Sequence, residues 1–373
     1  MKAKICHVTS VHSYLDERIY YKECVSLAKK YEVYLVAPNC DNQELNGVKI
    51  RGVELPKERI SRILNLKRLL PTLIDIDAEI YHFHDPELLY LGYIMKRKGK
   101  NVIFDSHEDV PMQIISKEWL PNILRKSISS IYKTIERFFL KRYTAVISVT
   151  PSIVQRLQKI NTKTYQITNY PIYKESEDYR KWNKEIVFTG GISPQWMHFI
   201  ILDSLKNLNV VYLLAGRPEY EFLEKMKSHP CWSKVDFRGL IKHTEVNKFI
   251  QHASAGVALN DYVPNVGYKM GSLGNTKLFE YMMAGIPVIG TDFILWKEIL
   301  EGYKCGICVN PHDEQSISAA IKMLTENPQM AKEMGDNGKR AVKEKYNWSE
   351  QEKILFRIYD NILANIDENN NIA

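Results

Sequence analysis

The stretch GSLGNTKLFEYMMAGIPVIGTD, residues 271–292, carries the most informative pattern of this chain. Its first four residues include two glycines and predict a flexible turn, and Asn275 and Thr276 are residue types that favour the start of a helix. A helical pattern over residues 276–284 is followed by an apolar run, residues 287–292, that predicts a buried strand. A turn, a helix and a buried strand in this order indicate part of a parallel α/β sheet.

The same alternation of strand and helix extends outward along the chain in both halves. Helical spacing recurs, for example, over residues 16–30, 88–98 and 219–227. The other apolar runs that predict strands are residues 4–10, 32–38, 80–85, 101–107, 145–150, 186–191, 210–216, 235–239, 255–260 and 306–311. This pattern predicts an α/β fold with two Rossmann-like, doubly wound domains.

A polar segment, residues 173–185, has few aliphatic side chains and is the predicted linker between the two domains. It separates an N-terminal domain, residues 1–172, from a C-terminal domain, residues 186–348. Residues 349–373 are expected to contribute a last helix. Because ligands of doubly wound sheets bind at the carboxyl ends of the strands, the residues that follow the predicted strands are the candidates for a site.

The composition of the 373 residues is that of a packed globular protein, with 45% hydrophobic and 25% charged residues. No stretch reaches the roughly 18 uncharged apolar residues that a membrane-spanning helix needs, and the opening MKAKICHVTS lacks the apolar core of an export signal. Six cysteines are too few for a disulfide framework at this length. These observations predict a cytoplasmic protein with reduced thiols.

Two patterns that resemble metal sites are interpreted as structural. Cys305 and Cys308 have C-x-x-C spacing, but they lie in a predicted buried strand with no second pair nearby. Asp75 and Asp77 spell a D-x-D pattern, but they precede a predicted strand, at the end of the sheet where active sites do not form. No spacing of the histidines matches a known zinc pattern. We therefore predict no required metal.

Basic residues are concentrated in the first half of the chain. Residues 1–169 hold 27 Lys and Arg against 18 Asp and Glu, whereas the remainder is slightly acidic. This asymmetry predicts a polyanionic neighbour for the first half. Nucleic acid is not the expected neighbour, because the other half is acidic and no exposed aromatic residues are interleaved with the basic ones.

A predicted helix over residues 120–142 carries much of this charge. Its apolar side chains recur at helical spacing and are expected to line one face of a core-packed helix; they are Leu124, Ile128, Ile131, Ile135 and Phe138. The basic side chains on the opposite side are Lys126, Lys133, Arg137 and Lys141. That side is either a solvated surface or a contact with anionic lipid, where each basic residue contributes about 1 kcal/mol.

Lys277 and Glu280 lie in the first turn of the predicted helix in the opening stretch and share one helix face. A helix start offers free N–H groups to phosphate, and a lysine adds a full positive charge there. A cation for a diphosphate and a carboxylate for ribose hydroxyls fit a nucleotide. The alternative is an exposed Lys–Glu pair that contributes only a few tenths of a kcal/mol.

This stretch resembles the donor-nucleotide motif of glycosyltransferase family 4, whose members are retaining enzymes. The family has the GT-B fold, in which two Rossmann-like domains face each other across a cleft. The resemblance extends over most of the chain. Further similar segments are HSYLDERIYYKECVSLAKKYEVYLVAP, YHFHDPELL and VIFDSHED in the first half, and IVFTGGIS, VYLLAG, VDFRGLI and CGICVNP in the second.

The resemblance implies a glycosyltransferase of the hexosyl or N-acetylhexosaminyl class. Such an enzyme moves a sugar from a UDP- or GDP-sugar to a glycan or lipid-linked acceptor during synthesis of a surface polysaccharide such as a bacterial capsule. It works without a cofactor or a metal, with a nucleoside-diphosphate sugar as co-substrate. We expect a cytoplasmic protein, peripheral on the inner face of the cell membrane through the basic helix 120–142, whose last helix packs back on the N-terminal domain.

The resemblance also implies roles for individual residues. His107 matches the histidine that contacts the transferred sugar near its anomeric centre, Lys277 a basic residue on the diphosphate, and Glu280 the acid that holds the ribose. The other expected donor-binding residues are Gly190, Gly191, Arg217, Gly239, Leu240, Ile241, Ser272, Leu273, Gly274, Asn275 and Thr276. The residues expected on the acceptor side or in the cleft are His12, Asp16, His84 and Asp85.

The sequence departs from the family pattern at two positions. Many members have a second acid where this chain has Ser272, so contacts to the sugar hydroxyls from this loop must differ. Many also have a basic residue after the glycine-rich strand end, where this chain has Trp196. Lys277 then neutralises the diphosphate alone or with Arg217. These departures keep two alternatives open, a nucleotide-sugar epimerase of the same fold and a non-catalytic GT-B protein that binds a partner.

Overall fold

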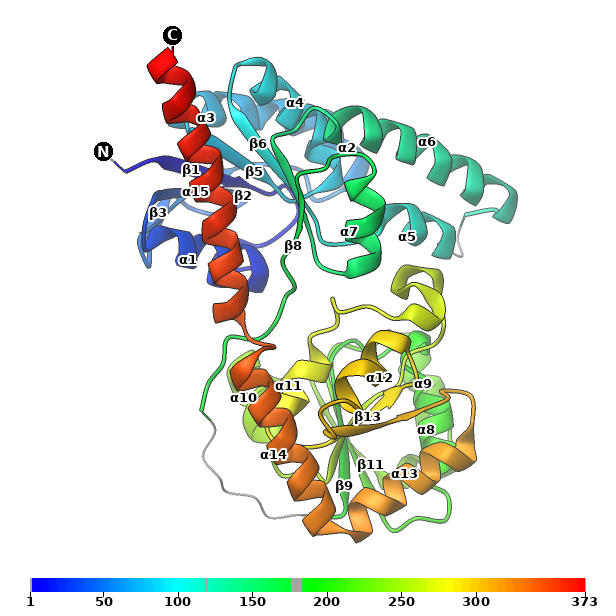
Figure 1. Cartoon of the computed structure of the whole chain (residues 1–373). Coiled ribbons are helices and arrows are strands. Elements are labelled where there is room, and N and C mark those ends of the chain that lie inside the picture. The colour runs from blue at the N-terminus through cyan, green and yellow to red at the C-terminus, as the bar shows by residue number, and fades with distance from the viewer. Residues whose placement is uncertain (1, 118–119, 176–182, 373) are drawn as a thin grey trace. The chain divides into compact units, whose positions relative to one another are not determined.

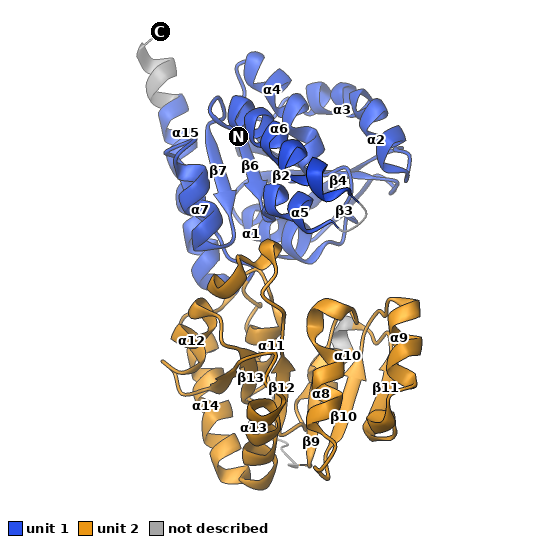
Figure 2. Ribbon diagram, turned by 90° about the vertical axis from the view of Figure 1, so that its right-hand side faces the viewer, with its two compact units in different colours: residues 1–169, 348–373 blue, residues 170–347 orange. Residues whose placement is uncertain are grey.

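The computed structural model describes residues 2–117, 120–175 and 183–372, and it forms two compact units. Unit 1 comprises Met1–Asn169 together with Trp348–Ala373, and unit 2 comprises Tyr170–Asn347 (Figure 2). The division therefore lies after residue 169. Within the predicted linker, positions 176–182 are outside the described residues.

The described part of unit 1 contains an eight-stranded sheet in which all neighbouring strands are parallel except one edge pair. In order across the sheet, the strands are β3 (Gln43–Leu45), β4 (Val48–Val53), β2 (Glu32–Pro38), β1 (Lys4–Val8), β5 (Ile80–Phe83), β6 (Asn101–Ser106), β7 (Ala145–Ser148) and β8 (Thr164–Gln166). The five strands predicted in this half are present. The carboxyl ends of β1, β5 and β6 are neighbours, so the residues after them lie close together.

The helices of unit 1 cover both faces of this sheet (Figure 1). The helix predicted over residues 16–30 is a wide π-helical segment, η1, that continues into α1, and its N-cap Asp16 accepts hydrogen bonds from the N–H groups of Arg18 and Ile19. The helical segments are η1 (Glu17–Cys24), α1 (Val25–Ala28), α2 (Arg59–Asn65), η2 (Leu66–Arg68), α3 (Leu69–Ile76), η3 (Pro86–Leu88), α4 (Leu89–Arg97), α5 (Val110–Ser116), α6 (Asn122–Leu140), α7 (Pro151–Gln158) and α15 (Trp348–Ile372).

The C-terminal helix α15 packs along one face of the unit 1 sheet (Figure 1). Leu355, Ile358 and Tyr359 are buried in the same cluster as Ile5 of β1 and Val33 of β2. The chain thus returns to its first unit after completing the second.

Unit 2 contains a six-stranded parallel sheet within the described residues. In order across the sheet, the strands are β11 (Val235–Gly239), β10 (Val211–Ala215), β9 (Glu185–Thr189), β12 (Ala255–Ala258), β13 (Val288–Thr291) and β14 (Gly306–Val309). The helical segments are η4 (Pro194–Trp196), α8 (His198–Ser204), α9 (Tyr220–Lys227), η5 (Pro230–Lys234), α10 (His243–Ile250), η6 (Pro264–Val266), η7 (Tyr268–Met270), α11 (Lys277–Met283), α12 (Ile294–Leu300), α13 (Glu314–Glu326) and α14 (Pro328–Glu344). All six predicted strands are present. Together the two sheets confirm the α/β fold with two Rossmann-like units.

One prediction about orientation is wrong. Helix α6 forms where it was expected, but its apolar stripe faces solvent instead of the core. The exposed fractions are 47% for Leu124, 36% for Ile128, 60% for Ile131, 46% for Ile135 and 45% for Phe138. The buried positions of α6 are instead Ser129, Glu136 and Leu140. Helical periodicity identifies an apolar face, but it does not say what that face meets.

Candidate functional site

The strand order of the unit 2 sheet reverses between β9 and β12, and ligands of such sheets bind at the carboxyl edge beside this point. Gly190 follows β9 and Gly216 follows β10, with φ angles of +135° and +145° that side chains other than glycine rarely adopt. A Cβ atom on Gly216 would lie 1.7 Å from the carbonyl oxygen of Gly190. Two glycines therefore let two strand ends approach at the point where ligands of such sheets bind.

Lys277 is the first residue of α11, and its side chain lies directly against Gly190. A Cβ atom on Gly190 would be 2.3 Å from Cε of Lys277. The Tyr281 hydroxyl accepts a hydrogen bond of 3.0 Å from the N–H of Thr189, which fixes α11 against the end of β9. Burial lowers the pKa of Lys277 to about 8, although nearby Glu280 opposes this change. The site thus holds a partly desolvated cation beside a glycine strand end.

The Lys277 ammonium is held by an aromatic ring that sequence reasoning did not connect with it. Its Nζ atom lies 4.0 Å from the centroid of the Trp196 ring and 5.3 Å from that of Phe188. Such cation–π contacts contribute roughly 0.5–2 kcal/mol. The sequence marks Trp196 only as an aromatic residue where many family members have a basic one. The sequence shows that residue 196 is aromatic, but it does not show that Trp196 contacts Lys277, 81 positions later.

The loop before α11 is shaped by its own hydrogen bonds. Ser272 Oγ accepts from the N–H of Gly274 at 3.0 Å, and the Ser272 carbonyl accepts from Nε1 of Trp296 at 2.9 Å. The Asn275 side-chain oxygen accepts from the N–H of Lys277 at 3.2 Å. Leu273 is buried, whereas Thr276 provides the N-cap without a side-chain hydrogen bond. Ser272 therefore supports the backbone of the loop where a second acid was expected.

The remaining predicted donor-side residues lie along the same sheet edge. Gly239 ends β11, and its carbonyl accepts from the N–H of Gly216 at 2.8 Å. Leu240 is 79% exposed and Ile241 is partly buried, so an apolar surface is available beside this strand end. Arg217 is exposed next to Gly216, and the space around Gly191 is open.

In unit 1, three of the predicted residues come together at the ends of β1, β5 and β6. His107 directly follows β6, and its ring centroid is 5.4 Å from that of His12. His12 Nδ1 is 3.2 Å from Oδ2 of Asp16, and this hydrogen bond raises the pKa of His12. Burial alone would raise the pKa of Asp16, but hydrogen bonds from His12 and the backbone lower it to about 2. Asp16 is thus a carboxylate that orients a half-exposed imidazole.

The other two residues predicted for this edge are buried. Asp85 Oδ2 accepts hydrogen bonds from Thr9 Oγ1 at 2.8 Å and from the N–H of Ser10 at 2.6 Å, so it anchors the loop after β1. Its second oxygen lies 3.4 Å from Nε2 of His12. His84 is only 1% exposed and contacts His7, so it belongs to the interior of the unit.

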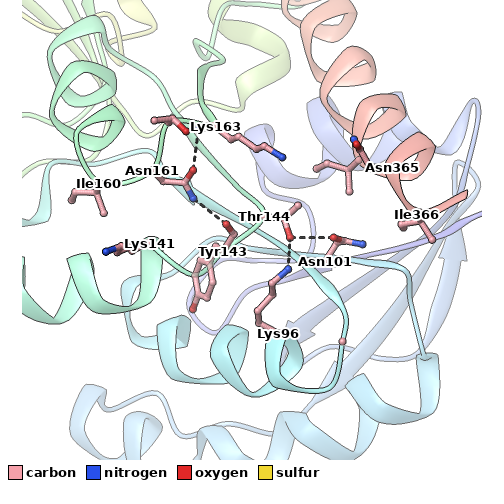
Figure 3. A pocket seen from close by; sticks show the side chains of 13 residues that line it. Lys96, Asn101, Lys141, Tyr143, Thr144, Ile160, Asn161, Lys163, Asn365 and Ile366 are labelled. Carbon is pink, nitrogen blue, oxygen red and sulfur yellow. Dashed lines mark hydrogen bonds between the residues drawn. The ribbon is translucent and has the colours of Figure 1, made fainter. Parts of the chain in front are cut away.

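Three other features do not belong to this site. Cys305 and Cys308 are free thiols, and burial raises the pKa of each to about 12. Asp77 closes α3 as its C-cap and pairs with Lys100. The pocket in Figure 3, of about 750 Å³, lies at the amino-terminal edge of the unit 1 sheet, where Lys96 hydrogen-bonds Thr144. None of the predicted site residues lines it.

Two family models match the chain. The model described as glycosyltransferase family 4 matches residues 17–169, and the model described as glycosyl transferases group 1 matches residues 171–341. A phosphatidyl-myo-inositol mannosyltransferase of Mycobacterium leprae is 21% identical over 78% of this chain and 75% of the relative.

Solved structures share the fold. A sucrose-phosphate synthase from Thermosynechococcus elongatus superposes with a TM-score of 0.76 at 15% identity, over 97% of this chain and all of that chain. An Anabaena protein solved in complex with UDP-glucose gives a TM-score of 0.69 at 12% identity, over 96% of this chain and 99% of that chain. Each unit therefore has the Rossmann-like fold of the domains in GT-B proteins. No described helix is long and apolar enough to cross a bilayer.

Proposed function

The chain belongs to the glycosyltransferases of family 4, which have the GT-B fold, and on that premise we propose that it is a retaining enzyme of surface polysaccharide synthesis. It transfers a hexosyl or N-acetylhexosaminyl group from UDP or GDP to a glycan or lipid-linked acceptor. The observation that carries this proposal is Lys277, a partly buried ammonium beside Gly190 and Trp196.

The chemistry asks for charge neutralisation and positioning. The bond between the anomeric carbon and the diphosphate oxygen breaks, and a bond to the acceptor oxygen forms on the same face of the sugar. The acceptor proton passes to the departing diphosphate. Lys277 neutralises the charge that develops on this leaving group, in a site where water is partly excluded and the interaction is stronger. Glu280 holds the ribose hydroxyls, and the exposed apolar surface at Leu240 receives the base.

His107 contacts the transferred sugar, and His12 stands beside it. The Asp16 carboxylate fixes the ring of His12, so the imidazole is oriented before the acceptor arrives. We assign the nucleotide to unit 2 and the acceptor to unit 1. The transfer step needs no metal in this proposal, because Lys277 supplies the positive charge that a divalent cation supplies in metal-dependent glycosyltransferases. The solved relative with UDP-glucose supports UDP as the first donor to test.

Thermal melting with a panel of nucleoside diphosphates and their sugars tests the proposal. We expect one base to stabilise the protein, since a ligand at a hundredfold excess over its Kd adds about 2.7 kcal/mol to the unfolding free energy. The Glu280→Ala variant should lose this shift, whereas Glu298→Ala, which removes an exposed carboxylate from α12, should keep it. No shift with any nucleotide, from protein shown to be folded, would favour the non-catalytic alternative.

We also propose that α6 lies on the inner face of the cell membrane. Its stripe of five exposed apolar side chains, Leu124 to Phe138, ends next to Arg142, whose guanidinium stacks on the Phe138 ring. An apolar stripe with a basic flank is typical of helices that lie in the plane of an anionic lipid surface. The mannosyltransferase relative is named for a lipid acceptor, which supports this location for the enzyme.

Co-sedimentation with vesicles tests the membrane contact. The double variant Ile131→Ser with Ile135→Ser should bind phosphatidylglycerol vesicles about tenfold or more weakly, since full burial of an isoleucine contributes about 1.5–3 kcal/mol and these two are half exposed. Ile294→Ser, at a similarly exposed residue of unit 2, is the matched control. Equal binding of both variants, or equal binding to neutral phosphatidylcholine vesicles, would contradict the proposal.

A further inference from the structure

Three histidines and a glutamate meet in the interior of unit 1, away from solvent. His7 lies on β1, His82 lies on the neighbouring strand β5, His84 directly follows β5, and Glu23 lies on η1. The exposed fraction is 0% for His7, His82 and Glu23 and 1% for His84. A dry sheet–helix interface normally holds apolar side chains, so four polar groups at one point need a common partner.

The ligand atoms of these residues are arranged around one point. Glu23 Oε2 lies 3.7 Å from Nδ1 of His7, 3.9 Å from Nδ1 of His82 and 3.8 Å from Nε2 of His84. Nδ1 of His7 and Nε2 of His84 are 2.9 Å apart and share a hydrogen bond, which a bound cation would replace. Tetrahedral zinc with bonds of 2.0–2.1 Å holds its ligand atoms about 3.4 Å apart. Small side-chain movements would bring all four atoms to that spacing.

The hydrogen bonds present do not satisfy this cluster. Neither carboxylate oxygen of Glu23 accepts a hydrogen bond, although both are fully buried. Among the described residues, Arg18 supplies the guanidinium of this cluster. Its Nε atom lies 2.7 Å from Oδ2 of Asp105 and its Nη2 atom 3.2 Å from Oε1 of Glu23, so one positive charge faces two carboxylates. An ionised Glu23 therefore leaves the cluster one positive charge short, and buried carboxylates are costly without compensation.

The surroundings match those of a bound cation. Histidines that bind metals usually direct their second nitrogen at a carboxylate or another acceptor, which fixes the ring. His84 Nδ1 lies 3.5 Å from Oδ2 of Asp105, and His7 Nε2 lies 3.2 Å from the hydroxyl of Tyr359 on α15. The same hydroxyl is 2.7 Å from Nδ1 of His82, the nitrogen that also faces Glu23, so this ring would exchange its bond to Tyr359 for the cation.

We propose that His7, His82, His84 and Glu23 bind one structural divalent cation, with zinc the ion that best fits three imidazoles and a carboxylate in tetrahedral geometry. The cation joins β1, β5 and η1, and Tyr359 connects it to α15. It is buried within unit 1 and takes no part in sugar transfer. Metal binding of this kind contributes directly to folding, because the unfolded chain does not hold the site together.

Elemental analysis of the purified full-length protein tests this site. We expect about one zinc per chain, and cobalt substitution should give the visible absorption bands of tetrahedral Co²⁺. Glu23→Gln keeps the shape of the side chain but removes a ligand charge, and it should lose most of the bound metal. His198→Asn is the matched control, because His198 is also fully buried and bonds a tyrosine, Tyr212, at 2.9 Å, but has no such cluster.

Thermal melting distinguishes two sources of the missing positive charge, a bound metal ion and a proton on Glu23. A strong chelator should lower the melting temperature of the wild type, added zinc should restore it, and Glu23→Gln should respond to neither. The proposal is overturned if the wild type carries no metal and melts unchanged with zinc or chelator. Glu23 would then be protonated, and Glu23→Gln would be as stable as the wild type.

Discussion

The Lys277→Met variant should bind nucleoside diphosphates about 10- to 100-fold more weakly than the wild type. A hydrogen bond to a charged group contributes roughly 1.5–3 kcal/mol, and each 1.4 kcal/mol is tenfold in affinity. Methionine keeps the apolar packing against Gly190 and Trp196, which a smaller side chain would lose. Calorimetric titration with the diphosphate that stabilises the wild type measures the effect.

The affinity of the wild type should also fall as the pH rises through about 8. The pKa of Lys277 is lowered to about 8, so the ammonium is charged below that pH and increasingly neutral above it. The ligand does not contribute to this change, because its phosphate groups are already ionised above pH 7. The Lys277→Met variant should show no such fall.

Lys269→Met is the matched control for this prediction. Lys269 is an exposed lysine eight residues earlier whose ammonium lies 5.4 Å from the Tyr262 ring, so it also makes a cation–π contact but has no glycine strand end beside it. We expect wild-type affinity and the wild-type pH dependence. If both lysine variants bind equally well, the diphosphate does not bind at Lys277.

The strands and their ends could be predicted because local patterns determine them. Runs such as residues 33–37 and 255–258 are apolar along their length, as strands buried on both faces must be, and glycines mark where several strands end. Strands β3, β4 and β8 lie toward the two edges of the sheet, and no apolar run predicts them. In β3 and β4 most side chains are exposed or partly buried, so their pattern resembles a loop.

Contacts between distant residues could not be predicted in the same way. The place of Lys277 at the start of a helix predicts its role, whereas its partner Trp196 lies on a different element and no sequence pattern connects the two. The cluster around Glu23 draws on two strands and a helix, so no spacing in the sequence marks it. Helix α6 is a further example. The sequence predicts its apolar stripe, but whether that stripe is exposed depends on neighbours far along the chain.

The Gly216→Ala variant should lose about 3–5 kcal/mol of unfolding free energy. A φ angle outside the regions that side chains tolerate costs roughly 1–3 kcal/mol, and overpacking costs roughly 1–3 kcal/mol more. At Gly216 both apply, because φ is +145° and the new Cβ atom would lie 1.7 Å from a backbone oxygen that cannot rotate away. Urea denaturation followed by circular dichroism measures the loss.

Two further glycines of the same sheet edge separate the causes. At Gly191 a Cβ atom would meet open space and φ is not positive. We therefore expect Gly191→Ala to change the unfolding free energy by at most about 0.5 kcal/mol, as at ordinary surface positions. Gly239→Ala also has open space, but its φ of +64° requires the left-handed conformation, which costs about 1–2 kcal/mol. A loss at Gly216 no larger than that at Gly239 would mean that the two strand ends can move apart.

Such movement would have a consequence for the nucleotide. Gly190, whose oxygen the new methyl group would displace, is also the surface against which the Lys277 side chain lies. A folded Gly216→Ala protein should therefore bind the diphosphate more weakly as well, although residue 216 contributes no charge. Gly239→Ala should leave the Lys277 ammonium in place, so binding to this variant should keep the wild-type fall in affinity as the pH rises through about 8. Stability and binding are linked at Gly216 because one close approach of two strand ends supports both.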